Sequence, residues 1–314
     1  MRSRISFFKR LSENLKNGSI FNIMSQEKHN SHVKTGCPDV SILIRTKNEG
    51  RYLKKTLSIL FSQTYNNHEI LIVDSGSTDN TLDIATKYPV KIIEIKPEDF
   101  SFGYSLNYGI QHAKGKYIIC LSAHALPIGD AWIQTIIDNF SDERVAAVMT
   151  RTMPWPDCNP FDRRGLLRKY NRPKMNIAKG PLSIFSNANS VIRKEIWKKV
   201  PFDETLTGSE DCDWQMKVAK LNYKIMYEPE AKLYHSHNET LKQIYRRSYR
   251  EDYANRKLKI PSYPLWKMFA DFSIGSLYDM FYVLAKRDNP KWLFFAPLRR
   301  FVMNYARFRA SRSN

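Results

Sequence analysis

Apolar runs alternate with amphipathic segments between residues 40 and 150, and this alternation organises the first half of the chain. Each run is short enough to be a buried strand, and each intervening segment places apolar residues at helical spacing. The predicted strands are 40–45, 69–74, 90–95, 117–122 and 145–150. Strands that alternate with helices imply right-handed crossovers, so the pattern predicts an α/β domain with a mostly parallel sheet and flanking helices.

The pattern is less regular after residue 150. Residues 151–181 are rich in Pro, Arg and Asn, which is typical of a long functional or mobile loop. Residues 182–192 predict a strand with small polar residues at its middle. Asn187 and Asn189 would share one face of that strand, because side chains alternate along it.

Two more strands are predicted at 224–229 and 231–237, as a pair. His235 and His237 are two positions apart in the second strand, so we expect their side chains on the same face. The acidic segment 208–214 lies between these strands and the preceding helix, and it opens another predicted helix.

The two ends of the chain differ from its centre. Ile5, Phe8, Leu11 and Leu15 have helical spacing, which predicts a short amphipathic helix within residues 1–24, either on a membrane or docked on the protein. Residues 25–38 have no periodicity and end in a proline, as a linker does. The predicted organisation is an N-terminal basic segment with its linker at 1–38, the α/β domain at 39–250 and a helical basic and aromatic tail at 251–314.

The net charge of +19 is concentrated in these ends. Residues 1–34 hold seven basic and two acidic residues, and residues 242–314 hold sixteen and five. Basic arms of this kind suit nucleic acid or an anionic membrane surface. The last 73 residues also hold 16 of the 40 aromatics, which favours the membrane, because Trp and Tyr suit the headgroup layer. Nucleic acid stays as the less favoured partner.

Apolar runs and cysteines bear on the compartment. No run of about twenty apolar residues is present, and charges interrupt the N-terminus, so neither a spanning helix nor a signal peptide is predicted. The four cysteines are scattered without metal-type spacing, which predicts reduced thiols. We therefore expect a cytoplasmic protein that can associate peripherally with the inner face of the membrane.

Polar residues follow three of the predicted parallel strands. The strand at 40–45 runs into residues 45–49, the strand at 69–74 into residues 74–79, and the strand at 117–122 into Ser122-Ala123-His124. Some of these residues could simply cap a helix or turn the chain. Because ligands of open α/β sheets bind at the carboxyl ends of the strands, three such loops on one edge predict a binding site.

Seven segments in order resemble family-2 glycosyltransferases of the GT-A fold. They are VSILIRTKNEG at 40–50, ILIVDSGSTDNT at 70–81, FSFGYSLNYGIQHAKGKYI at 100–118, LSAHALP at 121–127, FSNANSVIRKEIW at 185–197, GSEDCDW at 208–214 and YHSHNETLKQIYRR at 234–247. The likeness covers roughly residues 39–250. The paired histidines before a basic helix are most similar to bacterial rhamnosyltransferase-like members that build capsule or O-antigen chains.

The resemblance implies a nucleotide-sugar donor on the N-terminal half. Asp74 would accept a hydrogen bond from the base, which suits uracil or thymine, because their N3 carries a proton, and so points to a UDP- or dTDP-sugar. The remaining residues that the resemblance places around the donor are Thr46, Asn48, Glu49, Ser75, Gly76, Ser77, Asp79, Gly103, Asn107 and His124.

The resemblance also implies an inverting transfer with Asp211 as general base and Glu210 beside it. Such a base must reach the acceptor hydroxyl on the face of the sugar opposite the leaving diphosphate. Asn187, Asn189, Asp213 and Trp214 would lie on the acceptor side. A simpler interpretation is a helix N-terminus decorated with acids that the helix dipole favours.

The chain departs from the family where most members carry an Asp-X-Asp that holds a divalent cation. Ser122-Ala123-His124 occupies that place. Imidazole can bind Mn²⁺ but is a poorer ligand than carboxylate for Mg²⁺. Either His124 binds the cation with His235 or His237, or no metal is used and His124 donates directly to the diphosphate.

The predicted function is transfer of a sugar from a nucleotide-diphosphate donor to a saccharide or lipid-linked saccharide in surface polysaccharide synthesis. Two alternatives remain from other classes. One is a nucleotide-sugar-binding or scaffold protein that has lost catalysis because the Asp-X-Asp acids are missing, although the retained Glu210 and Asp211 argue against it. The other is a nucleic-acid binder that uses the basic tail.

Overall fold

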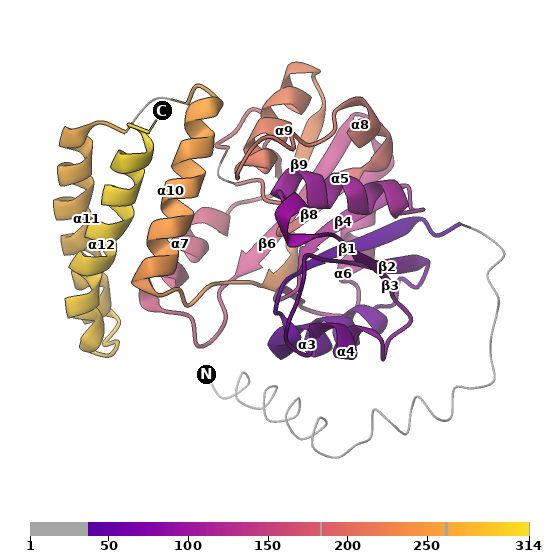
Figure 1. Ribbon diagram of the computed structural model, residues 1–314, viewed down its shortest axis with the longest axis horizontal. Helices are drawn as coiled ribbons and strands as arrows, with labels where there is room; N and C mark the ends of the chain where they lie inside the picture. The colour runs from indigo at the N-terminus through magenta and orange to yellow at the C-terminus, as the bar shows by residue number, and fades with distance from the viewer. Residues whose placement is uncertain (1–36, 183, 261–262, 314) are drawn as a thin grey trace, which may run out of the picture. The chain divides into compact units, whose positions relative to one another are not determined.

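The computed structural model describes residues 37–182, 184–260 and 263–313. The amphipathic helix predicted within residues 1–24 lies outside these residues. The apolar runs of the first half form strands, and the segments between them form helices (Figure 1).

The strands join in one nine-stranded sheet with the order β3-β2-β1-β4-β8-β6-β9-β5, and β7 pairs with β9 beside this path. Their bounds are β1 Val40–Thr46, β2 His68–Asp74, β3 Lys91–Glu94, β4 Tyr117–Ser122, β5 Leu126–Pro127, β6 Val145–Met153, β7 Met175–Asn176, β8 Asn189–Arg193 and β9 Lys224–Tyr234.

The predicted α/β sheet is confirmed, and its first part is parallel. β1 pairs in parallel with both β2 and β4, with Thr46 opposite Asp74 and Arg45 opposite Ser122. The carboxyl ends of these three strands therefore meet at one edge. The sheet becomes mixed beyond β4, because β8 runs antiparallel between β4 and β6.

Three element predictions of the second half are corrected. The strand predicted from residue 182 begins only at Asn189, because Ser186 and Asn187 make local turn bonds with Asn189 and Ser190 that compete with the strand ladder. The strands predicted as a pair are one strand, β9, whose register against β6 shifts after Glu228. Residues 229–231 have no partner on β6 and form a bulge, so the strand continues through Pro229.

The predicted loop at 151–181 contains a helix, α7 (Pro160–Tyr170). Asn159 caps this helix by accepting a hydrogen bond from the backbone N–H of Asp162 at 3.0 Å. Pro160 follows in the first turn, where its missing N–H costs nothing.

Two apolar layers cover the sheet. Ile42 and Ile44 of β1 pack into one layer and Leu43 into the other, as the period of a strand requires. The first layer contains α3 (Gly50–Phe61), α4 (Thr81–Ala85) and α6 (Trp132–Ile137), and the second contains α5 (Phe102–His112), α8 (Lys194–Lys199) and α9 (Glu210–Lys220). Figure 1 shows α5, α8 and α9 together on one side of the strands, with α3 and α4 on the other.

The C-terminal tail is helical, as predicted. It contains α10 (Leu241–Lys257), α11 (Leu265–Ala285) and α12 (Lys291–Ala310), and the boundary predicted at residue 250 falls inside α10. Figure 1 shows these helices beside the sheet domain, with α11 outermost. Among the described residues, no helix has the length and apolar character needed to cross a bilayer.

A buried carboxylate ties these helices to α7. Asp279 of α11 has no exposed side-chain surface and pairs with Arg164 of α7 and with Arg300 of α12. Arg299 of α12 pairs with Asp162 of α7 at 2.7 Å. The tail is thus attached through charged pairs in addition to apolar contacts.

Replacing Asp279 with Asn should destabilise the protein strongly, because two guanidinium groups would lose their shared partner. We expect a loss of about 3 kcal/mol in the free energy of unfolding, measured by urea denaturation. The control is Glu195→Gln, which removes an exposed ion pair with Lys199 and should cost less than about 1 kcal/mol. Equal losses in the two variants would show that the buried pair does not anchor the tail.

Candidate active site

Asp74 organises the loop that follows β2. Its carboxylate accepts hydrogen bonds from the backbone N–H groups of Gly76 and Ser77 at 3.0 and 2.8 Å, and from the hydroxyls of Thr46 and Ser77 at 2.8 and 2.6 Å. A carboxylate has about four acceptor positions, so all of them are used. A contact between Asp74 and a base, as the resemblance implies, would require one of these bonds to be exchanged.

Asn48 joins the loops that follow β1 and β2. Its side-chain oxygen accepts hydrogen bonds from the backbone N–H groups of Thr78 and Asp79 at 2.7 and 3.3 Å. The backbone N–H of Asn48 donates to Ser77 Oγ at 2.8 Å. The residue holds φ at 58°, a left-handed conformation that Asn tolerates better than most residues. Asp79 also accepts from the N–H of Gly50 at 3.1 Å. The two loops therefore form one hydrogen-bonded wall.

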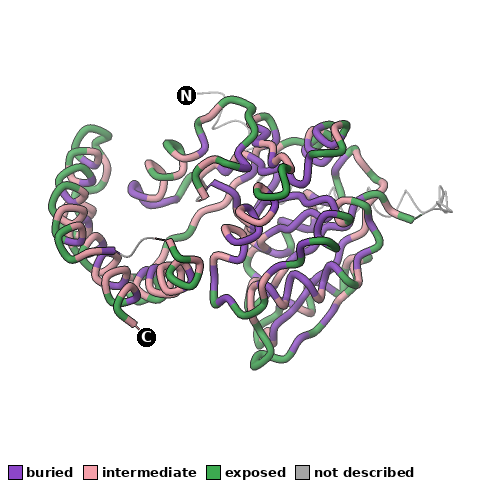
Figure 2. The backbone as a smooth tube through the Cα atoms, turned by 90° about the horizontal axis from the view of Figure 1, so that it is seen from above, coloured by how far each residue is buried: buried purple, intermediate pink, exposed green. Residues whose placement is uncertain are grey.

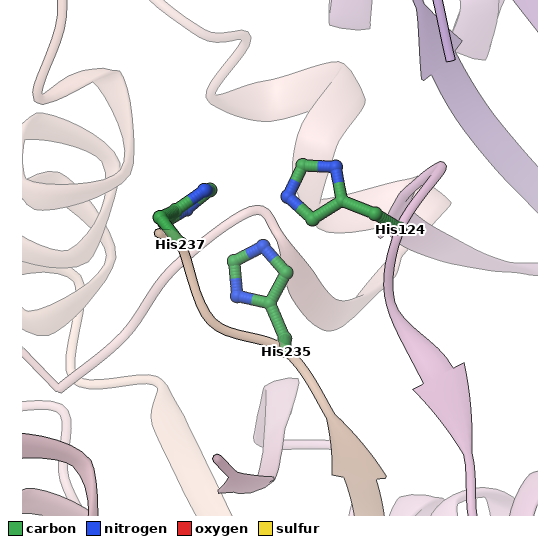
Figure 3. A group of neighbouring side chains, drawn as sticks. All are labelled: His124, His235 and His237. Atoms are coloured by element: carbon green, nitrogen blue, oxygen red, sulfur yellow. The ribbon is translucent and has the colours of Figure 1, made fainter. Parts of the chain in front are cut away.

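A three-histidine cluster lies next to this wall (Figure 3). His124 comes from the turn after β4, whereas His235 and His237 come from the segment after β9. One ring nitrogen from each residue lies within 4.8 Å of the others. The rings point toward one another, with centroids 4.8 Å apart for His124 and His235 and for His235 and His237.

The sheet explains why these histidines meet. β5 pairs with β9 so that Leu126 lies opposite Tyr234, which places the turn before β5 beside the residues after β9. The backbone N–H of His235 donates to Met153 O at 2.9 Å and fixes the end of this segment. The histidines thus come together from positions more than a hundred residues apart.

Glu49 connects the cluster to the donor wall. Its carboxylate lies 3.0 Å from Nδ1 of His124, and its backbone N–H donates to Thr81 Oγ1 at 2.8 Å. Ser122 Oγ is 3.2 Å from the same ring nitrogen. The resemblance implies that Glu49 lies around the donor, and in the structure its carboxylate contacts His124.

Burial keeps part of the cluster neutral. It lowers the pKa of His235 well below the usual value, and the neighbouring histidines add to this effect. Desolvation by the surrounding side chains and the neighbouring His124 also lower the pKa of His237, although this residue is exposed to solvent. A neutral imidazole has a free lone pair for a cation. Ring nitrogens from three histidines, with a carboxylate beside them, fit an ion that accepts imidazole, such as Mn²⁺, better than they fit Mg²⁺.

The acidic pair lies at the start of α9. Glu210 is buried, and Asn187 donates toward it at 3.4 Å. Burial, together with the charge of Glu210, raises the pKa of the Asp211 carboxyl to about 7. A carboxyl group with such a pKa is suited to accept a proton near neutral pH.

Lys169 of α7 is a residue that the sequence analysis missed. Its charge lowers the pKa of both Asp211 and His235, so it lies near the acidic pair and the cluster alike. Lys169 falls in the segment predicted as a loop. Without a predicted helix there, the sequence does not show on which side of the segment the Lys169 side chain lies. Asn159 and Pro160 are the sequence signals that could have predicted this helix, because asparagine is typical of a helix N-cap and proline of the first turn.

Several predicted site residues serve the interior instead. The Asn107 side chain bonds to Trp197 Nε1, to both backbone groups of Phe202 and to Glu204, which uses both of its polar atoms. A Cβ added to Gly103 would meet the carbonyl oxygen of Asp203 at 2.4 Å, so this glycine permits close packing of the same segment. Both residues therefore pack against the segment that contains Phe202, Asp203 and Glu204.

The predicted acceptor side is dispersed in a similar way. Trp214 is fully buried in the core and donates to Val200 O at 2.8 Å. Asn189 donates to Thr152 Oγ1 on β6 at 2.8 Å. Asp213 pairs with Lys217 on its own helix. Of this set, Asn187 alone makes a side-chain hydrogen bond to the acidic pair among the described residues.

Solved structures with similar folds are glycosyltransferases of the GT-A type. The mannosyltransferase PcManGT from Pyrobaculum calidifontis, in complex with GDP-Man and Mn²⁺, matches with a TM-score of 0.60 at 18% identity, over 87% of each chain. TarS 1-349 of S. aureus in complex with UDP-GlcNAc matches with a TM-score of 0.53 at 16% identity, over 87% of this chain and 91% of that one. These likenesses confirm the GT-A fold.

Sequence comparisons place the chain in a family. The O-antigen chain rhamnosyltransferase WbaN of Salmonella anatum is 28% identical over 220 residues, which cover 67% of this chain and 70% of WbaN. Residues 41–200 match the model of the family described as Glycosyl transferase family 2. This match spans half of the chain, from β1 to the end of α8, and includes the donor wall and His124. The protein belongs to glycosyl transferase family 2.

Proposed function

We propose that this protein is an inverting glycosyltransferase that moves a hexosyl or deoxyhexosyl group from a nucleotide-diphosphate donor to a saccharide acceptor. The observation that carries the proposal is the three-histidine cluster, which lies beside the donor wall at the sheet edge and shares Lys169 with the acidic pair. The relatives and neighbours support a nucleotide-sugar donor, because their names include a rhamnosyltransferase and complexes with GDP-Man and UDP-GlcNAc.

The donor's nucleotide would lie along the wall formed by the loops after β1 and β2, with its diphosphate at the cluster. This arrangement puts the leaving group on one side of the sugar and leaves the other side for the acceptor. WbaN is named an O-antigen chain enzyme, so we propose that the acceptor belongs to a surface polysaccharide.

Asp211 would act as the general base. Its carboxylate takes the proton of the acceptor hydroxyl while the acceptor oxygen bonds to the anomeric carbon of the donor sugar. The bond between that carbon and the diphosphate oxygen breaks, and the nucleoside diphosphate leaves with the electron pair. Attack opposite the leaving group inverts the anomeric configuration.

His124, His235 and His237 would hold a divalent cation, with Glu49 orienting His124 through its Nδ1 contact. The cation would neutralise the charge that develops on the leaving diphosphate. The charge of Lys169 acts on both the base and the cluster, because it lowers the pKa of Asp211 and of His235.

Replacing Asp211 with Asn should lower kcat at least about a hundredfold, because the amide cannot accept the acceptor proton. Turnover of UDP- and dTDP-sugars, measured by product detection, tests this expectation. Asp213→Asn is the matched control, since this acid lies on the same helix but pairs with Lys217. Equal activity of wild type and Asp211→Asn would refute the base assignment.

The pH dependence should report the raised pKa of Asp211. The protonated carboxyl cannot act as a base, so kcat/KM should fall about tenfold per pH unit below about 7 and level off above it. Glu210→Gln removes one of the two causes of the shift, so the acid limb of the profile should move to lower pH. If the acid limb of the pH profile does not move in Glu210→Gln, then Glu210 does not cause the raised pKa of Asp211.

Chelation should abolish transfer, and Mn²⁺ should restore it more effectively than Mg²⁺, because the proposed ligands are imidazoles. His235→Ala should weaken Mn²⁺ binding at least about tenfold in isothermal titration calorimetry. His112→Ala is the control, because this ring lies on α5 and bonds to Tyr108 O. Full activity in the chelator would favour direct donation from His124 to the diphosphate.

A further inference from the structure

The outer side of α11 is apolar along its whole length. Its exposed residues recur at helical spacing and include Trp266 at 71%, Leu277 at 68% and Phe281 at 69% exposed surface. The other exposed large apolar residues of this helix are Leu265, Phe269, Ile274, Tyr278 and Leu284. Figure 2 shows α11 at the edge of the molecule, with its outer side exposed. An exposed helix side that is apolar from end to end marks a surface for interaction with something else.

α12 continues this surface. Phe294, Leu298 and Phe301 are exposed and recur at spacings of four and three, so they form one stripe. The ring of Phe301 contacts that of Phe272 on α11, with centroids 6.2 Å apart, so the two helices present neighbouring apolar surfaces. We call the exposed apolar residues of α11 and α12 the outer face.

Positive charges without ion partners lie at the ends of α11 and α12, the helices that carry the outer face. The three acids of this region, Asp271, Asp279 and Asp288, are all held in ion pairs. The cations without an ion pair among the described residues of α11, α12 and their flanking turns are Lys259, Lys286, Arg287, Lys291, Arg309 and Arg312. This surface therefore combines exposed aromatics with uncompensated positive charge.

We propose that the outer face docks on a membrane surface that contains anionic lipids. Large exposed apolar surfaces mark interaction sites, and aromatic side chains with Lys and Arg suit the boundary between headgroups and acyl chains. A second copy of the chain fits less well, because it would bring the same free cations and no free acid to meet them. A nucleic acid would match the charge but would leave the aliphatic residues in water.

The outer face would lie in the plane of the membrane. α11 has 21 residues and is about 30 Å long, and its apolar side runs from end to end. Lys286 and Arg287 follow it directly, where they can contact lipid phosphates. This placement rests on the tail alone and holds whether or not the proposed transfer reaction is correct.

The test is co-sedimentation of the full chain with vesicles of phosphatidylcholine, with and without phosphatidylglycerol. Leu277→Ser/Phe281→Ser should lower the partition coefficient on mixed vesicles at least about tenfold, because two apolar side chains no longer enter the lipid. The matched control is Leu167→Ser/Leu221→Ser, which changes two exposed leucines on α7 and after α9 and should bind as wild type does. Thermal unfolding of each variant checks that the fold is kept.

The charge is tested separately with Lys286→Glu/Arg287→Glu. This variant should lose affinity for the anionic vesicles by about tenfold or more and change little on phosphatidylcholine alone. Added salt should weaken wild-type binding to the anionic vesicles, because it screens the same charges.

Three outcomes would overturn the proposal. One is wild-type protein that does not sediment with anionic vesicles but forms a dimer, in analytical ultracentrifugation, that Leu277→Ser/Phe281→Ser abolishes. Another is salt-sensitive binding to RNA or DNA with no binding to vesicles. The third is vesicle binding that both double-serine variants retain equally, which would place the contact elsewhere in the chain.

Discussion

The pairing of β9 with β5 and β6 is the constraint on which the site depends. β6 pairs with β9 along most of the length of β9. The short β5 pairs with the end of β9 and so brings the turn after β4 next to that end. Without this pairing, His124 would be separated from the other two histidines by the width of three strands. The pairing of the strands therefore brings the three histidines together, although His124 is far from the other two in the sequence.

The sequence predicted the parallel part of the sheet well because the signal there is local. Each strand of that part is an uninterrupted apolar run, and its loops contain polar residues at the point where a parallel strand ends. The structure shows that several of these polar residues bond to one another. The resemblance implies donor contacts for Asp74 and Asn48, and in the structure these two residues also hold the wall together.

The elements in the second half of the chain could not be fully predicted from the sequence, for physical reasons. Whether Glu228 and Lys232 belong to one strand or two depends on a bulge against β6, which is a tertiary feature. Asn107 and Trp214 match polar or aromatic positions of a family motif, but their burial depends on helices packed over them. Spacing along the chain identifies which residues share an element, and it does not show which side of that element meets the core.

The contact between Glu49 and His124 has a thermodynamic consequence. Glu49 lies at the start of α3, where its backbone is bonded to the loop after β2, while its side chain reaches the turn after β4. Any ligand that reorients His124 must therefore change the free energy of the segment that borders the proposed nucleotide site. Linkage requires the effect to be mutual, so the two halves of the proposed donor site would not be filled independently. The affinity of each half would then depend on this one carboxylate.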